Sequence, residues 1–80
     1  MSTSAIRIEP RAVNVRVTTD ALEVQLADGR ELRVPLAWFP ALQAAPAAAR
    51  QDWRLIGGGV GIHWAAIDED LSVAGLLASR

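Results

Sequence analysis

Three short segments of the chain, residues 13–17, 22–26 and 32–36, alternate between apolar residues and other residues. A period of two places the apolar side chains on one face of an extended strand. Because the connections are short, the sequence predicts three strands in an antiparallel meander with one buried face. The predicted core-facing residues are Val13, Val15, Val17, Leu22, Val24, Leu26, Leu32, Val34 and Leu36. The predicted outward-facing residues are Asn14, Arg16, Glu23, Gln25 and Arg33.

The same alternation constrains the two turns, because directly opposed residues in a sheet share a face. Pairing Val17 with Leu22 needs an even-length loop, which is centred on Thr19 and Asp20. Pairing Val24 with Leu32 needs an odd-length loop around Asp28 and Gly29. We therefore expect a three-residue loop with a left-handed glycine and a G1-type bulge.

From Ala37 to Asp52 the sequence is rich in alanine and no longer alternates. Prolines divide an alanine-rich stretch into two expected helical pieces, about 38–45 and 46–52, with a break at Pro46. Residues 53–56 and 62–64 are expected to form two more strands. Ser72 is a favourable cap for a last helical turn at 73–77.

The resulting fold class is α+β. It consists of a three-stranded antiparallel β-meander, short helices, two further short strands and a C-terminal helical turn. We expect residues 1–11 to be a flexible N-terminal arm and residues 12–80 to be a single small α+β domain.

The composition excludes several classes of function. The net charge is −1 and the eight basic residues, all arginine, are interleaved with nine acids, which does not favour nucleic acid as a partner. No apolar run approaches the ~18 residues of a membrane span. The first residues lack the pattern of a secretory signal, and the chain has no cysteine, so we expect a cytoplasmic protein.

The glycine-rich stretch from Gly57 to Gly61 raises the question of a phosphate site. A phosphate loop needs a helix directly after it, so that the backbone N–H groups and the helix dipole meet the anion. Here a strand-like segment follows, so we expect a flexible hairpin loop without an anion.

His63 is the only histidine, and Asp68, Glu69 and Asp70 follow it closely. Zinc needs three or four convergent ligands, and only these acids can complete a set. The simpler interpretation is a half-buried sheet histidine beside an acid-rich helix start. No serine lies in a nucleophile motif. We therefore expect no enzyme activity, no catalytic residue, no cofactor and no metal ligand.

The aromatic residues are Trp38, Phe39, Trp53 and Trp64. A domain of this size needs large side chains to fill its core, and alternation points Trp64 inward together with Ile62. Tryptophan is also a frequent anchor of protein interfaces. All four aromatic residues are therefore candidate contacts for a protein partner.

Two ordered motifs carry a family resemblance: W-F-P-x-L from position 38, and G-I-H-W-x-x-I-D-E-D-L-S-V-x-G-L-L from position 61. With D-G-R from position 28 and V-P-L from position 34, the chain resembles the small bacterial proteins grouped as domain of unknown function 2442 over most of residues 13–77. The resemblance implies an α+β fold and brings no catalytic residue. It also implies a neighbouring small protein, since the pairing of such genes has suggested toxin–antitoxin-like modules.

Two hypotheses from different classes follow. The first is a non-enzymatic binding module that acts through a small protein partner, with a toxin-like partner as one form and self-association as a further option. The alternative is a ligand- or metal-binding regulatory domain that uses His63 with Asp68, Glu69 and Asp70, near the loop of residues 57–61.

Overall fold

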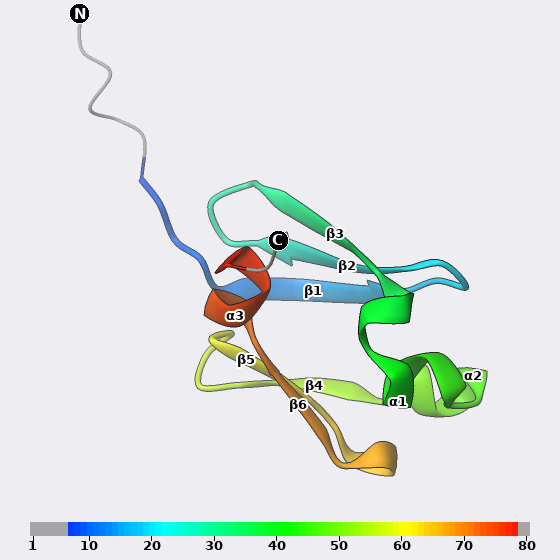
Figure 1. The fold of residues 1–80 in the computed structure, drawn as a ribbon. Coiled ribbons are helices and arrows are strands. Elements are labelled where there is room, and N and C mark those ends of the chain that lie inside the picture. The colour runs from blue at the N-terminus through cyan, green and yellow to red at the C-terminus, as the bar shows by residue number, and fades with distance from the viewer. Residues whose placement is uncertain (1–6, 79–80) are drawn as a thin grey trace, which may run out of the picture.

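The computed structural model describes residues 7–78 and places two three-stranded sheets in two layers (Figure 1). The first sheet contains β1 (Ala12–Val17), β2 (Ala21–Leu26) and β3 (Glu31–Pro35), in that order and antiparallel. The predicted meander is therefore confirmed. Residues 1–6 of the expected arm, and residues 79–80, lie outside the described part of the chain.

In both turns of the meander the number of residues between the paired positions, even in the first and odd in the second, is the one that alternation requires. Val17 pairs with Leu22, and Val24 pairs with Leu32. In the second turn Gly29 has a φ of 94°, its N–H donates to the Leu26 carbonyl, and the Leu26 N–H donates to the Arg30 carbonyl. This is the hydrogen-bond pattern of a type I turn closed by a G1 bulge, which confirms the predicted loop.

One core prediction is wrong, because β1 contains an irregularity that alternation cannot show. Ala12 pairs with Leu26 and Asn14 pairs with Gln25, so Val13 is an extra residue in the ladder. The bulge turns the Val13 side chain outward, where 53% of it is exposed, and puts Ala12 in the core.

The helical connection between the sheets comprises η1 (Leu36–Trp38), α1 (Pro40–Ala44) and α2 (Ala47–Arg50). Pro40 occupies the first turn of α1, where its missing N–H costs nothing. The predicted break lies at Pro46, which precedes α2 in an extended conformation. The helical connection thus spans residues 36–50.

The second sheet contains β4 (Trp53–Ile56), β5 (Gly61–Trp64) and β6 (Glu69–Ser72), all antiparallel. A 3₁₀ turn, η2 (Ala65–Ile67), joins β5 to β6, and α3 (Val73–Ala78) follows directly. The sequence predicted two of these strands and assigned the acidic segment to a helix start. That assignment is wrong, because Glu69 to Ser72 pair with β5.

The end of the chain matches the prediction of a capped helical turn. The Ser72 Oγ accepts a hydrogen bond from the Gly75 N–H at 3.0 Å, as an N-cap does. Val73 and Leu76 of α3 are buried. Among residues 7–78, no helix has the length and apolar character needed to cross a membrane.

The core lies between the two sheets. Trp64, Ile62, Leu22, Val24, Leu36, Leu42 and Val73 are its largest fully buried side chains. Trp64 and Ile62 belong to the same apolar cluster as Val15, Val24 and Val34, as alternation in β5 predicted. The second sheet therefore closes the core of the first.

Candidate functional site

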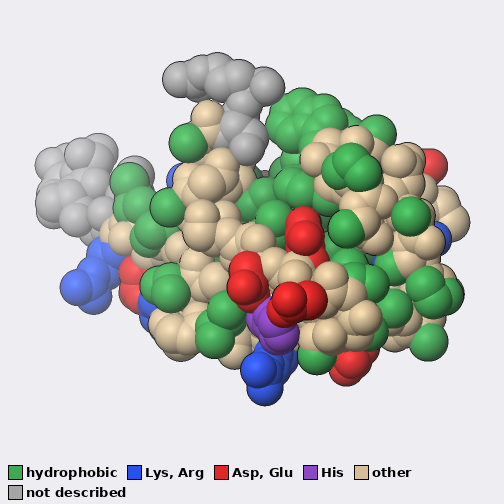
Figure 2. All heavy atoms as spheres, turned by 60° about the horizontal axis from the view of Figure 1, so that its bottom comes forward, with side chains coloured by type: hydrophobic (Ala, Val, Ile, Leu, Met, Phe, Trp, Pro, Cys, Tyr) green, Lys and Arg blue, Asp and Glu red, His purple; other side chains and the backbone are tan. Residues whose placement is uncertain are grey.

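His63 lies in the middle of a row of polar residues on the outer face of the second sheet. It is paired with Arg54 of β4 on one side and with Asp70 of β6 on the other. Its Nδ1 lies 2.6 Å from Oδ1 of Asp70, and 17% of its side chain is exposed. In Figure 2 the histidine reaches the surface between acidic side chains and a basic one. The predicted half-buried sheet histidine is thus the observed arrangement.

The other two acids do not join this pair. Asp68 ends η2 in a left-handed conformation with a φ of 51°, so the extended segment begins only at Glu69. Glu69 pairs with Trp64, one position away from the His63 row. Within residues 7–78, no three histidine or acidic side chains converge to hold a metal ion.

The glycine loop lies at the other end of β5 from these acids. Gly61 pairs with Ser72, whereas Trp64 pairs with Glu69 next to the acidic turn. A strand follows the loop, as the sequence indicated, and not the helix that a phosphate loop needs. The alternative hypothesis of one site that combines the loop with the acids therefore finds no geometric support.

Contacts from both neighbouring segments hold the glycine loop. The Ala12 N–H donates to the Gly59 carbonyl at 2.7 Å, and Arg11 donates to the Gly58 carbonyl at 3.3 Å. On the other side the Val73 N–H donates to the Val60 carbonyl. Gly59 is buried against β1. The loop that was expected to be flexible therefore joins the two sheets.

The four candidate aromatic residues have different environments. Trp64 is fully buried, and its Nε1 donates to the Arg50 carbonyl at 2.9 Å, so it is a core residue and not a surface contact. Phe39 and Trp53 are partly buried against the core. Only Trp38 leaves a large part of its side chain exposed, at 47%.

Trp38 belongs to an uncharged run of residues, which the composition of the whole chain does not reveal. Residues 34–49 contain no acidic or basic residue. The exposed members of this stretch are Pro35, Ala37, Trp38, Pro40, Ala41, Gln43, Ala44, Pro46, Ala47 and Ala48. A helical surface segment normally exposes charged side chains to water. Figure 2 shows hydrophobic side chains gathered on the side where Figure 1 places α1 and α2.

An open, shallow hollow of about 580 Å³ adjoins the same segment. Its lining residues come from α2, the turn after it, and η2: Pro46, Ala48, Ala49, Gln51, Asp52 and Ala66. Its walls are therefore mainly alanine and proline. Asp52 contributes the one charged side chain, and that carboxylate has no hydrogen-bond or ion-pair partner among residues 7–78.

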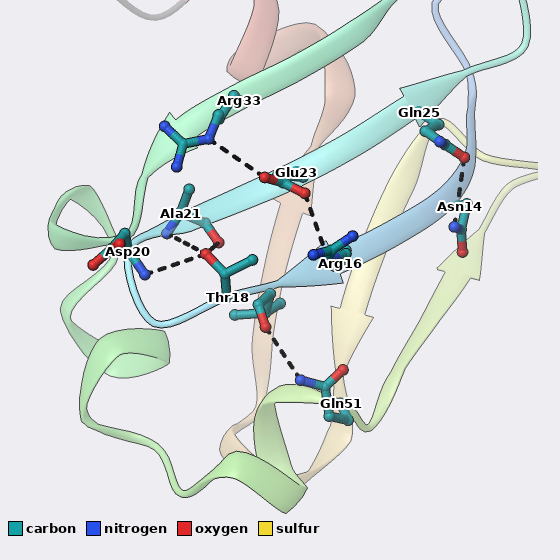
Figure 3. A network of polar contacts seen from close by, with 10 residues as sticks. Asn14, Arg16, Thr18, Asp20, Ala21, Glu23, Gln25, Arg33 and Gln51 are labelled. Atoms are coloured by element: carbon teal, nitrogen blue, oxygen red, sulfur yellow. Dashed lines mark hydrogen bonds and ion pairs between the residues drawn. The ribbon is translucent and has the colours of Figure 1, made fainter.

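The outer face of the first sheet is built in the opposite way. Glu23 lies between Arg16, at 3.7 Å, and Arg33, at 3.3 Å, on the two neighbouring strands (Figure 3). Asn14 and Gln25 face each other one row along. Glu31, which is paired with Gln25 on this face, supplies a second acid, so two acids balance two arginines and the face resembles an ordinary solvated sheet surface.

Comparison with known proteins gives a family and a fold, without an activity. The family described as protein of unknown function (DUF2442) matches residues 12–80. A crystal structure of a protein of unknown function from Rhodospirillum rubrum is 32% identical, with a TM-score of 0.77 over 89% of this chain and 88% of that chain. No curated protein matches the chain. The chain belongs to the DUF2442 family of proteins of unknown function.

Proposed function

We propose that the chain is a non-enzymatic binding module that acts through a small protein partner, which it contacts with the helical connection. The observation that carries this proposal is Trp38, which is 47% exposed and belongs to a run of residues, 34–49, that contains no charged side chain. Truncating a central tryptophan is among the most costly changes at protein interfaces.

The charge pattern determines what kind of partner fits. Nucleic acids and anionic surfaces are bound through arginine and lysine, and the helical connection has none between Arg33 and Arg50. Charge-free surfaces complement apolar protein surfaces, since burying a charge opposite them would cost solvation energy. The partner should therefore present an apolar, uncharged patch.

One further feature supports a binding role over a catalytic one. The Ser72 Oγ accepts a hydrogen bond from the Gly75 N–H and caps α3, and none of the hydrogen bonds found within residues 7–78 joins it to His63. A nucleophile–base pair would need one of these groups to face the other at hydrogen-bond distance. The gene pairing suggested for the family makes a toxin-like partner a specific form of this proposal, and a cysteine-free chain suits the cytoplasm.

A capture experiment with matched variants tests the proposal. Wild-type chain, Trp38→Ala and Ile56→Ala are each used to capture proteins from the native host, and the captured protein is then purified and titrated by calorimetry. Ile56 is the control, because it is also an exposed apolar side chain, at 42%, but lies on the second sheet. We expect Trp38→Ala to weaken binding by at least about tenfold and Ile56→Ala to leave it unchanged. Equal capture by all three proteins would refute a role for this surface.

A further inference from the structure

The strand β3 lies at one edge of the first sheet, and within residues 7–78 no strand pairs with its outer side. The order of the sheet is β1-β2-β3, so β3 is paired with β2 alone (Figure 1). At the opposite edge the Ala12 N–H of β1 donates to the Gly59 carbonyl. The Val17 carbonyl of β1 accepts a hydrogen bond from the Gln51 side chain at 3.2 Å. The edge at β3 is therefore the one that can serve as a template for a further strand.

Hydrogen bonds at both ends of β3 show which way its backbone groups point. Just before the strand, the Leu26 N–H donates to the Arg30 carbonyl. Just after it, the Leu36 N–H donates to the Asp20 carbonyl, which directly precedes β2. Successive residues of an antiparallel strand turn their N–H and C=O groups to alternate sides. The even-numbered residues from 30 to 36 therefore face β2, and the odd-numbered residues face the open side.

The residues that face the open side are Glu31, Arg33 and Pro35. Pro35 has no N–H to donate. Apart from the pairing with β2, no hydrogen bond within residues 7–78 involves the backbone of Glu31 or Arg33. These two residues are therefore the positions of β3 at which an added strand can both donate and accept hydrogen bonds.

We propose that this edge binds β3 of a second copy of the chain, antiparallel and with the two-fold axis at Leu32, so that the two first sheets form one sheet of six strands. A pair of identical antiparallel strands has two-fold symmetry, so each contact occurs twice. With the axis at Leu32, Glu31 of each copy lies opposite Arg33 of the other. The outward-facing residues then exchange hydrogen bonds, and opposite charges face each other at both contacts.

The neighbouring registers are less favourable. An axis at Arg33 sets two arginines opposite each other and places Pro35, which has no N–H, opposite Glu31. An axis at Glu31 sets two glutamates opposite each other, and directly opposed like charges destabilise a strand pair. An axis between two residues would place an inner side chain opposite an outer one, because side chains alternate between the faces. The sequence of β3 therefore selects one register.

The side chains of both faces fit this contact. Arg33 lies 3.3 Å from Glu23, and its side chain is 68% exposed, so its guanidinium is accessible to a second carboxylate. Glu31 is exposed and makes no ion pair within residues 7–78. On the inner face Leu32, which is partly buried against the core, meets Leu32 of the second copy. The contact thus gives an unpaired acid its partner and covers an apolar side chain at the rim of the core.

This inference goes beyond the proposed function, because β3 ends at Pro35 and the helical connection begins after it. The first test is sedimentation velocity on the purified chain between about 1 µM and about 1 mM, which spans weak to moderate affinities. We expect a monomer–dimer equilibrium that stops at two copies, because the same edge of both copies is used up in the contact. A chain that stays monomeric throughout overturns the proposal, and so does mass that keeps growing with concentration.

Amide resonances in NMR spectra locate the contact. Between dilute and concentrated samples, we expect the N–H groups of Glu31 and Arg33 to shift and to exchange more slowly with solvent, because they become hydrogen-bonded to the second copy. The N–H groups of Leu32 and Val34 face β2 in both states and are the internal controls. A dimer in which Glu31 and Arg33 gain no protection overturns the proposal.

Charge reversal tests the register. Glu31→Arg sets arginine opposite Arg33 of the other copy, and Arg33→Glu sets glutamate opposite Glu31, so we expect each variant alone to weaken the dimer by at least about tenfold. Arg16→Glu is the matched control, because Arg16 also pairs with Glu23, at 3.7 Å, but lies on β1. It should dimerise as the wild type does, and circular dichroism checks that all three variants fold. A Glu31→Arg protein that dimerises as well as the control overturns the proposal.

Mixing the two charge-reversed variants gives the decisive result. The β3 strand of the Glu31→Arg protein carries two arginines, and that of the Arg33→Glu protein carries two glutamates. Opposite charges therefore face each other at both contacts of a mixed dimer. We expect the mixture to associate at least about tenfold more tightly than either variant alone. No gain on mixing would overturn the inference, because it would show that residues 31 and 33 do not face each other between the copies.

Discussion

The two sheets of this protein are stabilised in different ways. The first has strands of five or six residues, short turns of defined parity, and a charged outer face whose side chains pair across the strands. The second has strands of only four residues, and its inner face carries Trp53, Leu55, Ile62, Trp64 and Leu71. The first sheet is specified by local pattern, whereas the second depends on what it buries.

The second sheet therefore depends on its contacts with the first sheet. Strands of four residues are too short to persist as an isolated hairpin in water. The second sheet is held by Trp64 in the shared core and by the glycine loop against β1. Removing either link should therefore cost more than any change on the outer faces.

The largest effect should come from Trp64. Replacing a buried tryptophan with alanine costs about 3–5 kcal/mol, which approaches the whole stability of a small domain. Trp64 is fully buried, and its truncation also leaves the Arg50 carbonyl without its donor. We expect Trp64→Ala to lose its cooperative transition in a urea or thermal melt. Trp38→Ala should cost less, about 1–2 kcal/mol, because Trp38 is already 47% exposed in the folded protein. A cooperative Trp64→Ala protein of near-normal stability would contradict the dependence of the second sheet on burial.

The next largest effect should come from Gly59. Its φ is 108°, and a Cβ atom there would collide with the Ala12 carbonyl oxygen on β1. Gly59→Ala therefore combines backbone strain with a backbone clash, and we expect a loss of at least about 2 kcal/mol in chemical denaturation. Gly58 is the matched control, because its φ is 70° but its surroundings are open. Gly58→Ala should cost only the left-handed penalty of about 1–2 kcal/mol. Equal losses would show that the clash with β1 contributes nothing.

A smaller effect should appear only in acid, at the second turn of the first sheet. The Arg30 guanidinium donates to both carboxylate oxygens of Asp28, and with the backbone N–H groups of Arg30 and Glu9 it lowers the pKa of Asp28 to about 2. Because the folded pKa lies below the ordinary value of 3.8, this contact stabilises the fold above that pH. The stabilisation is lost as the pH falls from about 4 to about 2.

Denaturation of wild type and Asp28→Asn between pH 7 and pH 2 checks this prediction. The difference in stability between the two proteins should be constant at neutral pH and should shrink in the acid window. A difference that is independent of pH would mean that the Asp28 charge does not hold this turn.

The smallest effect should come from the outer face of the second sheet. The His63–Asp70 contact is close, at 2.6 Å, but Asp70 is 67% exposed, and a hydrogen bond that exchanges with water contributes only about 0.5–1.5 kcal/mol. We expect His63→Gln and Asp70→Asn each to destabilise by about 1 kcal/mol or less in thermal melts. Unfolding of either variant would mean that the polar row, and not the side chains that the second sheet buries, organises this sheet.

The sequence alone determined the parts of the fold that depend on near neighbours. Period-two alternation fixed the meander, and parity fixed the loop that needs a left-handed Gly29. Pro46 interrupted the helical connection, and Ser72 capped the last helix. Each of these features follows from the geometry of a few consecutive residues, which is why the chain itself reveals them.

Only the tertiary structure decided the features that join distant residues. The bulge that exposes Val13 arises from pairing with β2 and from the contact of Ala12 with Gly59, which lies 47 positions further along the chain. The acidic segment became β6 because β5 offered a free edge, although its residues have low strand propensity. That Trp64 is buried and Trp38 is exposed likewise depends on which side chains the folded chain packs against each indole ring. Burial and long-range pairing are properties of the packed chain, so local pattern predicts the elements but not these contacts.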